Sequence, residues 1–377
     1  MKFYDFGFSD TTSRRISVPL CGCKIISALS LALIIAVNAC KPRTFNQSGN
    51  KSTQNSANTE FKECLTAPLP TLEEKTPWAK QNSWFDDSAR PSHFALDGVT
   101  NLENNATSLK LEKSPSKDPA ITTQVNIKLF KGIEGRNPVK EPISIYLDDC
   151  QSEARKIEVL NTDEKGNIWP KIKLSETQGP GSYRMHARVD AHGSSVSWVV
   201  RFLPSGTRIV VFDIDETLTT DNKEYKTQIL TNSFTWITEK SYTPKHRAGA
   251  VEIVQARKDD KLQVFYLSGR PYFLMEFARS WLDELKFVPG HIEHTSNLLE
   301  VAPKNIGVGD WKTRVLKHWR DHLGFVLVKA YGNATTDIFA YKNAGLKNDS
   351  IFIVGKHTGA EGTVWVGDDF LTDHSKK

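Results

Sequence analysis

Between residues 84 and 205, apolar and polar residues alternate along the chain with a period of two. The alternation is clearest in residues 121–129, 183–189 and 196–202, and turn-forming residues such as Gly179-Pro180-Gly181 interrupt it. Successive side chains of a strand point to opposite faces, so this period is typical of antiparallel strands with one buried face. We expect an immunoglobulin-like β-sandwich over residues 84–205.

From Gly206 onward the pattern changes to short, mainly apolar runs rich in β-branched residues, which alternate with segments of helical spacing. The apolar runs are residues 209–212, 264–267, 326–330 and 351–354. Apolar side chains recur every three or four residues between Phe273 and Leu285 and again between Trp311 and Leu323. This order predicts an α/β, doubly wound parallel sheet over residues 206–377. Gly367-Asp368-Asp369 follows the last predicted strand and is expected to form a turn of the tail.

The first forty residues have the order of a secretory signal. Basic residues precede an apolar run at 25–37, and small residues follow, ending at Cys40. The apolar run is shorter than the ~20 residues of a membrane span. Residues 37–40 resemble a bacterial lipobox, which implies cleavage after residue 39 and lipidation of Cys40; ordinary cleavage that leaves Cys40 free is the alternative. We expect export to the bacterial cell envelope, with a lipid anchor on the periplasmic or outer-surface face.

Residues 40–83 are rich in Asn, Ser, Thr, Gln and Lys over their first half, which favours a flexible tether. Removal of residues 1–39 deletes four basic and two acidic residues, so the net charge falls from +5 to +3. This charge is too small to argue for nucleic acid as a partner. Cys64 and Cys150 lie outside the leader, and in an oxidising compartment they either pair or remain free thiols.

The candidate chemistry begins where the run at 209–212 ends, in Asp213-Ile214-Asp215-Glu216-Thr217. Ligands of open α/β sheets bind beyond the carboxyl ends of the strands. Alternation places Asp213 and Asp215 on one side, where one carboxylate can attack phosphorus and the other can transfer protons. A bound Mg²⁺ would offset the repulsion between a phosphate and the nucleophile. An Asp-rich helix cap is the alternative interpretation of this segment.

Three further segments, each near the end of a predicted strand or the start of a predicted helix, carry side chains suited to phosphoryl transfer. Ser268, Gly269 and Arg270 follow the second apolar run and can contact phosphate oxygens, as can Thr217. Lys312 stands at the start of a predicted helix and can pair with a phosphate. Asn333 and Asp337 follow the run at 326–330 and can complete a metal site, although either could also cap a helix.

The four segments DIDETLT, YLSGRP, Lys312 and YGNATTDIFAY together resemble the catalytic domain of the lipins, the Mg²⁺-dependent phosphatidate phosphatases of the haloacid dehalogenase (HAD) superfamily. The resemblance covers residues 209–355. It implies the following roles: Asp213 as nucleophile, Asp215 as general acid and base that binds the metal through its backbone carbonyl, Ser268 and Lys312 as phosphate contacts, and Asn333 and Asp337 as metal ligands with Asp213. Lipins also place an immunoglobulin-like element beside the phosphatase.

One residue departs from the lipin pattern, since Glu216 stands where lipins usually have glycine. Some lipin-like domains of lipid-transfer proteins lack the catalytic carboxylates and only bind phosphatidate, whereas both are present here. The sequence therefore predicts a Mg²⁺-dependent phosphatase acting on phosphatidate, a phosphorylated lipid. The alternatives are a non-catalytic phosphatidate-binding lipoprotein and an acid phosphatase for small, soluble phosphomonoesters.

Overall fold

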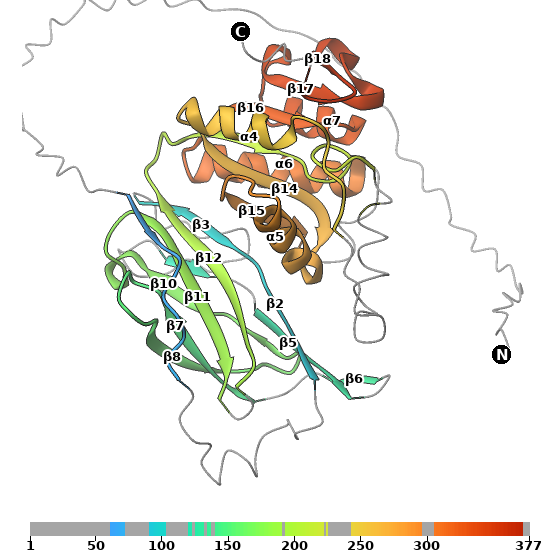
Figure 1. Ribbon diagram of the computed structural model, residues 1–377. Coiled ribbons are helices and arrows are strands. Elements are labelled where there is room, and N and C mark those ends of the chain that lie inside the picture. Colours follow the sequence, from blue (N-terminus) through green and yellow to red (C-terminus); the bar gives the residue numbers. More distant parts are fainter. Residues whose placement is uncertain are drawn as a thin grey trace, which may run out of the picture. The chain divides into compact units, whose positions relative to one another are not determined.

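The fold is taken from a computed structural model, which describes residues 61–71, 90–102, 120–122, 125–131, 134–136, 140–190, 193–221, 224, 243–295 and 305–371 (Figure 1). All of them lie in one compact unit, Ser56–Lys377. The predicted leader, the lipidation site Cys40 and most of the predicted tether lie outside the described residues. Within the described part, no helix is long and apolar enough to cross a membrane.

The β-rich region contains one six-stranded sheet and two smaller sheets. The large sheet has the order β3 (Gly98–Asn101), β12 (Ser195–Leu203), β11 (Gly181–Val189), β7 (Pro142–Leu147), β8 (Arg155–Asn161), with β1 (Lys62–Cys64) also paired to β11. The smaller sheets are β2 (Arg90–Ala95), β5 (Val125–Lys131), β6 (Glu134–Arg136) with β9 (Asn167–Ile168) on β5, and β10 (Lys171–Lys173) with β4 (Ala120–Thr122).

The antiparallel prediction holds for the long strands β11 and β12, which pair over eight residues of each strand. Alternate side chains of both strands enter one buried cluster, among them Tyr183, Met185, Trp198 and Val200. Two short strands differ from the prediction, because β1 pairs with β11 and β3 with β12 in parallel. The immunoglobulin-like character of this region stays a prediction.

Residues 62–64, which the sequence placed in the tether, form strand β1 of the large sheet. The segment has little apolar patterning, so its place depends on backbone pairing and on a covalent link. Lys62 N donates to Pro180 O at 3.0 Å, and Cys64 forms a disulfide with Cys150, with their Cα atoms 4.6 Å apart. The two cysteines therefore pair, which was one of the two alternatives left open by the sequence.

The C-terminal region is an α/β domain, which confirms that part of the predicted fold. Its six-stranded sheet is parallel throughout, in the order β15 (His291–Thr295), β14 (Gln263–Pro271), β13 (Arg208–Phe212), β16 (Val326–Gly332), β17 (Ile351–Val354), β18 (Val364–Gly367). Its α-helices are α4 (Ala250–Asp259), α5 (Met275–Glu284), α6 (Asp310–Lys317) and α7 (Thr335–Asn343). Short 3-10 turns occupy Leu174–Glu176, Tyr272–Leu274, Asn348–Ser350, Gly355–His357 and Ala360–Gly362, and π-helical turns occupy Asn305–Gly309 and His318–His322.

Helices cover both faces of this sheet because neighbouring residues of β13 enter different cores. Val210 and Phe212 pack with α4 and α5, whereas Ile209 and Val211 pack with α6 and α7. A strand buried on both faces reads as a continuous apolar run, which is why the sequence revealed it. The helical spacing from Trp311 to Leu323 corresponds to α6 and the π-helical turn that continues it.

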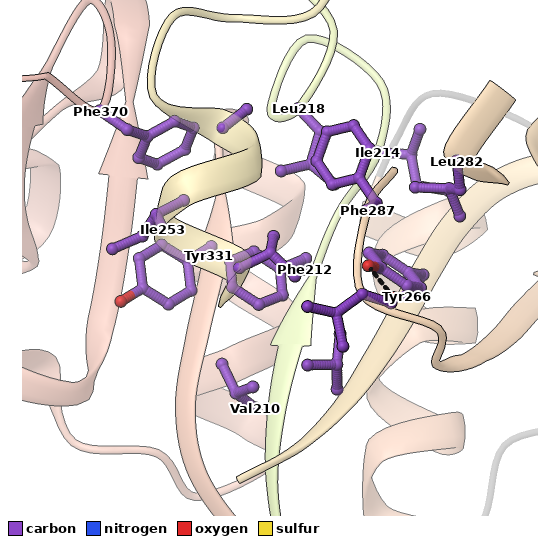
Figure 2. Packing of buried hydrophobic residues seen from close by; sticks show 14 of the residues in the cluster. Val210, Phe212, Ile214, Leu218, Ile253, Tyr266, Leu282, Phe287, Tyr331 and Phe370 are labelled. Atoms are coloured by element: carbon purple, nitrogen blue, oxygen red, sulfur yellow. Dashed lines mark hydrogen bonds between the residues drawn. The ribbon is translucent and has the colours of Figure 1, made fainter. Parts of the chain in front are cut away.

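Aromatic packing fixes the carboxyl end of β13, as Figure 2 shows. The rings of Phe212 and Tyr331 stack with centroids 4.6 Å apart, and Tyr266 lies on the other side of Phe212 at 6.4 Å. The Tyr266 hydroxyl donates to Val288 O at 2.7 Å. Asp213 N, one residue further on, donates to Tyr331 O at 3.0 Å. The backbone at Asp213 is therefore held by a packed core directly beneath it.

Strand β18 is an element that was not predicted, and it changes the expectation of a tail turn at Gly367-Asp368-Asp369. It pairs in parallel with β17 and ends at Gly367, so Gly367 belongs to the sheet, and Asp368 and Asp369 lie in the bend that follows. The strand is short and stands at the edge of the sheet, and its Trp365 is exposed. Its apolar run, Val364-Trp365-Val366, has three residues, fewer than the four of the shortest run used to predict a strand, so the sequence pattern did not identify it.

Candidate active site

The candidate residues gather at the carboxyl ends of three neighbouring strands, β14, β13 and β16. Asp213 follows β13, Ser268 and Arg270 lie among the last residues of β14, and Asn333 follows β16. Lys312 comes from the first turn of α6 and Asp337 from the first turn of α7. The sheet order thus brings together segments that are up to about 120 residues apart in the sequence, as expected for an open α/β sheet.

Lys312 joins two carboxylates at the centre of the site. Its Nζ donates to Asp213 Oδ1 at 2.6 Å and to Asp337 Oδ1 at 2.7 Å, and all three side chains are buried. Burial raises the pKa of Asp213, and the ammonium of Lys312 works against that rise. Burial alone would lower the pKa of Lys312, but the two carboxylates outweigh it and raise the pKa above its ordinary value. Lys312 is therefore a charged ammonium between two acids.

The second oxygen of Asp213 faces Thr217 and Asn333. Thr217 Oγ1 lies 2.8 Å from Asp213 Oδ2 and 3.1 Å from Asn333 Oδ1, and its single proton can be donated to one of them at a time. Asn333 Nδ2 donates to Glu216 Oε2 at 2.8 Å. The oxygen of the Asn333 amide is consequently directed toward Thr217 and the nucleophile, while its nitrogen is directed toward Glu216.

Asp337 caps its own helix in addition to binding Lys312. Its Oδ2 accepts from the backbone N–H groups of Asn333 and Ala334, each at 3.0 Å. Asp337 therefore caps its helix and also lies beside Lys312, while its role as a metal ligand stays a prediction. The backbone of Gly332 passes close to the Asp337 side chain, because a Cβ added to Gly332 would lie 2.6 Å from Asp337 Cβ. Glycine at 332 allows the end of β16 to pass beneath the carboxylate.

Asp215 binds a different cation from Asp213. Arg270 donates to Asp215 Oδ1 from Nε at 3.0 Å and from Nη2 at 2.8 Å, and Ser268 Oγ donates to Oδ2 at 3.0 Å. Burial alone would raise the pKa of Asp215, but the Arg270 guanidinium outweighs it and holds the pKa below its ordinary value. Ser268 and Arg270, predicted as phosphate contacts, bind a carboxylate in this structure because the guanidinium fork matches its geometry.

The oxygen atoms of the site match the donor set that Mg²⁺ prefers. They include the carboxylate of Asp213, the amide oxygen of Asn333 and the backbone carbonyl of Asp215, and Mg²⁺ usually binds one or two carboxylates and keeps several waters. Among the described residues, no three His, Cys, Asp or Glu side chains form a metal cluster. Asp337 already binds Lys312 and two backbone N–H groups, so it is the least available of the four predicted ligands.

Arg247 belongs to the site and was not predicted from the sequence. Its Nη2 and Nε donate to the backbone oxygen of Glu216 at 2.7 and 3.2 Å, and its Nη1 donates to Asp368 O at 2.5 Å. Arg247 acts on backbone oxygens from a distant loop, so no residue type or spacing near the motif indicated it.

Gly269, which was predicted as a phosphate contact, lies beside Val308. The Val308 side chain would be 3.1 Å from a Cβ added at position 269.

The α/β domain is similar to a domain of lipid-transfer proteins. The family model "PITM 1-3, LNS2 domain" matches residues 210–355, which is less than half of the chain. The match agrees with the lipin-type, HAD-like domain predicted from the sequence. Among curated proteins, the chain is 29% identical over 217 residues to protein retinal degeneration B of Drosophila melanogaster, and 26% identical over 219 residues to human membrane-associated phosphatidylinositol transfer protein 2.

Each of these two alignments covers 58% of this chain, but only 16% and 15% of the relatives. The chain therefore spans about a sixth of the length of the proteins it matches. Among solved structures, a class C acid phosphatase from Bacillus anthracis with tungstate bound shares 15% identity, covering 35% of this chain and 54% of the phosphatase. Its TM-score of 0.24 is too low for the likeness to support a conclusion.

Proposed function

We propose that this chain is a Mg²⁺-dependent phosphatase that hydrolyses a phosphomonoester, with phosphatidate as the favoured substrate. The observation that carries the proposal is the buried group of Lys312, Asp213 and Asp337 at the carboxyl ends of a parallel sheet. A buried ammonium between two carboxylates is a costly arrangement for stability alone, and perturbed ionisable groups of this kind concentrate at functional sites.

In the proposed reaction an oxygen of Asp213 attacks phosphorus, and the bond between phosphorus and the leaving oxygen breaks. Asp215 gives its proton to the leaving alcohol, then takes a proton from the water that attacks the aspartyl-phosphate and releases inorganic phosphate. Lys312 offsets the negative charge that gathers around Asp213. A bound Mg²⁺, held by Asp213, Asn333 and the Asp215 carbonyl, would neutralise phosphate charge.

Asp215 must exchange its partners before it can act as an acid. Its carboxylate is bound by Arg270 and Ser268, and it must carry a proton when the leaving group departs. A substrate phosphate competes with Asp215 for the same guanidinium and hydroxyl. We infer that phosphate binding draws Arg270 and Ser268 to the substrate, which would restore their predicted roles as phosphate contacts and release Asp215.

A non-catalytic function is the second candidate. One of the relatives is named as a membrane-associated phosphatidylinositol transfer protein, and the pairing of Asp215 with Arg270 keeps the candidate acid ionised. A domain in this state could bind phosphatidate through Arg270 and Lys312 without turnover. The relatives' names and the phospholipid chemistry they imply favour a lipid phosphate over a soluble one as the ligand in either case.

Phosphate release from phosphatidate in mixed micelles with Mg²⁺ tests the proposal. We expect release by the wild type, complete loss with EDTA, and a loss of at least ~10³-fold in Asp213→Asn, because the amide is not a nucleophile. Vesicle co-sedimentation without any phosphate release would favour the binding function. Phosphate release from small phosphomonoesters but not from phosphatidate would mean that the protein is a phosphatase with a soluble substrate.

We also propose that the protein is anchored to the bacterial cell envelope through a lipid on Cys40. The support is the order of basic, apolar and small residues before that cysteine. Cell fractionation after metabolic labelling with a fatty acid tests it. The wild type should be labelled and membrane-bound, and Cys40→Ala should be unlabelled; equal labelling of the two would exclude this anchor.

A further inference from the structure

Glu216 has a backbone conformation that favours glycine. Its φ is +58°, in the left-handed region where a Cβ crowds the following carbonyl oxygen. Such conformations persist in non-glycine residues only where the surroundings impose them, and they cluster at functional sites. A glutamate at this position therefore needs a reason beyond the path of the chain.

The backbone of the turn is held without help from the Glu216 side chain. Glu216 N donates to Thr219 Oγ1 at 2.9 Å, and Glu216 O accepts both hydrogen bonds from Arg247. Glycine at this position would keep these contacts and remove the steric cost. The reason for glutamate must then lie in what its side chain contacts.

The carboxylate of Glu216 contacts the Asn333 amide at its nitrogen end. A carboxylate only accepts hydrogen bonds, and the distance from Asn333 Nδ2 to Glu216 Oε2 is 2.8 Å. Thr217 Oγ1 is 3.1 Å from the opposite end of the same amide, Asn333 Oδ1. Because the carboxylate can only accept, it holds the nitrogen end of the amide at Glu216 and leaves the oxygen end facing Thr217.

We propose that Glu216 is a positioning residue that keeps the oxygen of Asn333 directed toward Asp213, where it serves as a ligand for a divalent cation. The inference rests on the proposed function and adds a residue to it. Without the carboxylate, the amide is free to rotate and present its NH₂ group, which cannot bind a cation.

The test compares Glu216→Gly and Glu216→Gln with the wild type in two measurements: Mg²⁺ affinity by calorimetry and the thermal midpoint without metal. Groups that orient a metal ligand typically contribute 10–100-fold to affinity. We expect Glu216→Gly to weaken Mg²⁺ binding by roughly that factor while its midpoint without metal stays the same or rises, because glycine suits the backbone. A residue that was only structural would not separate the two measurements in this way.

Lys261→Gly is the matched control, because Lys261 also has a positive φ, +64°, and is exposed at the end of α4. It should raise the midpoint and leave Mg²⁺ affinity unchanged. In an Asn333→Ala background, Glu216→Gln should have no further effect on affinity. If both Glu216 variants bind Mg²⁺ with wild-type affinity, the positioning role of Glu216 is excluded, but the proposed function is not. A wild type that neither binds Mg²⁺ nor releases phosphate would overturn the proposed function.

Discussion

Lys312 shows at the scale of one residue how this site differs from ordinary surface electrostatics. Its ammonium balances two carboxylates that are almost completely removed from water. An exposed ion pair contributes little to stability, but removal of one partner from a buried pair leaves an uncompensated charge. The same lysine is therefore expected to support both stability and catalysis.

Lys312→Met should lower the free energy of unfolding by ~3–5 kcal/mol and abolish phosphate release, because Asp213 and Asp337 lose their common partner. Urea denaturation and the phosphatase assay measure the two effects. Adding Asp213→Asn to Lys312→Met should recover part of the lost stability, since it removes one of the two unpaired charges. Additive losses in the double variant would contradict the proposed coupling.

His186 links stability to pH at the same scale. It is buried in β11, its Nδ1 lies 2.8 Å from Ser197 Oγ, and burial together with nearby Arg184 lowers its pKa to about 4, against a smaller opposing effect of Asp148. The unfolded chain has a histidine pKa of ~6.5, so between pH 6.5 and 4 the unfolded state binds more protons. The contribution of the neutral imidazole is present above pH 6.5 and is lost as the pH falls through this window.

We expect the free energy of unfolding to decrease on acidification from pH 6.5 to 4, and His186→Gln to reduce the slope by at most ~1.4 kcal/mol per pH unit. Denaturant titrations at several pH values give the slopes. Identical slopes for wild type and His186→Gln would show that His186 does not carry this dependence.

At the scale of elements, the contact between β16 and α7 sets the position of Asp337. Gly332→Ala would place a Cβ 2.6 Å from Asp337 Cβ and 2.8 Å from its carboxylate carbon, so the helix terminus must move. We expect a loss of ~1–3 kcal/mol in stability and a loss of Mg²⁺-dependent activity. Thermal denaturation and phosphate release measure both. A fully active Gly332→Ala enzyme would mean that the site tolerates displacement of Asp337.

The burial and length of each strand decided whether it could be predicted from the sequence. Strands β13, β14 and β17 are buried on both faces along most of their length, and β16 is buried at its carboxyl end, so all four have mainly apolar runs of four or more residues. Strand β18 stands at the edge of the sheet with only three consecutive apolar residues, Val364-Trp365-Val366, and β1 has three residues in all, so neither has a run of that length. Parallel topology then predicted which segments of the site would meet, because it brings strand ends to one edge.

The partners of individual side chains could not be predicted in this way. Arg270 binds Asp215, and Arg247 binds the backbone of Glu216, through contacts that depend on side-chain reach and on a distant loop. Spacing within a motif does not contain that information. The disulfide between Cys64 and Cys150 is similar, because two cysteines in a sequence leave pairing and free thiols equally open.

At the scale of the whole molecule, Asp97 connects the β-rich region with the α/β domain. Its side chain is 1% exposed and binds Arg279 of α5 at 2.9 Å, Arg201 of β12 at 3.5 Å and the backbone N–H of Val199 at 2.9 Å. Burial alone would raise the pKa of Asp97, but the two guanidinium groups outweigh it and lower the pKa, so the carboxylate is charged. The buried carboxylate of Asp97 thus pairs with one arginine of the β-rich region and one of the α/β domain.

The two regions also share apolar packing, since Val99 and Leu203 lie in the same buried cluster as Ile209 and Val211. Because a shared buried core makes separate unfolding costly, we expect calorimetry to record one cooperative transition for the wild type. Asp97→Ala should lower the midpoint of that transition, at a cost of ~3–5 kcal/mol, because buried Arg201 loses its carboxylate partner and Arg279 keeps only Glu276. Asp163→Ala, in an exposed turn of the β-rich region, is the control and should have a much smaller effect. Two resolved transitions in the wild type, of which Asp97→Ala shifts only one, would show that the regions fold independently and that Asp97 stabilises a single region.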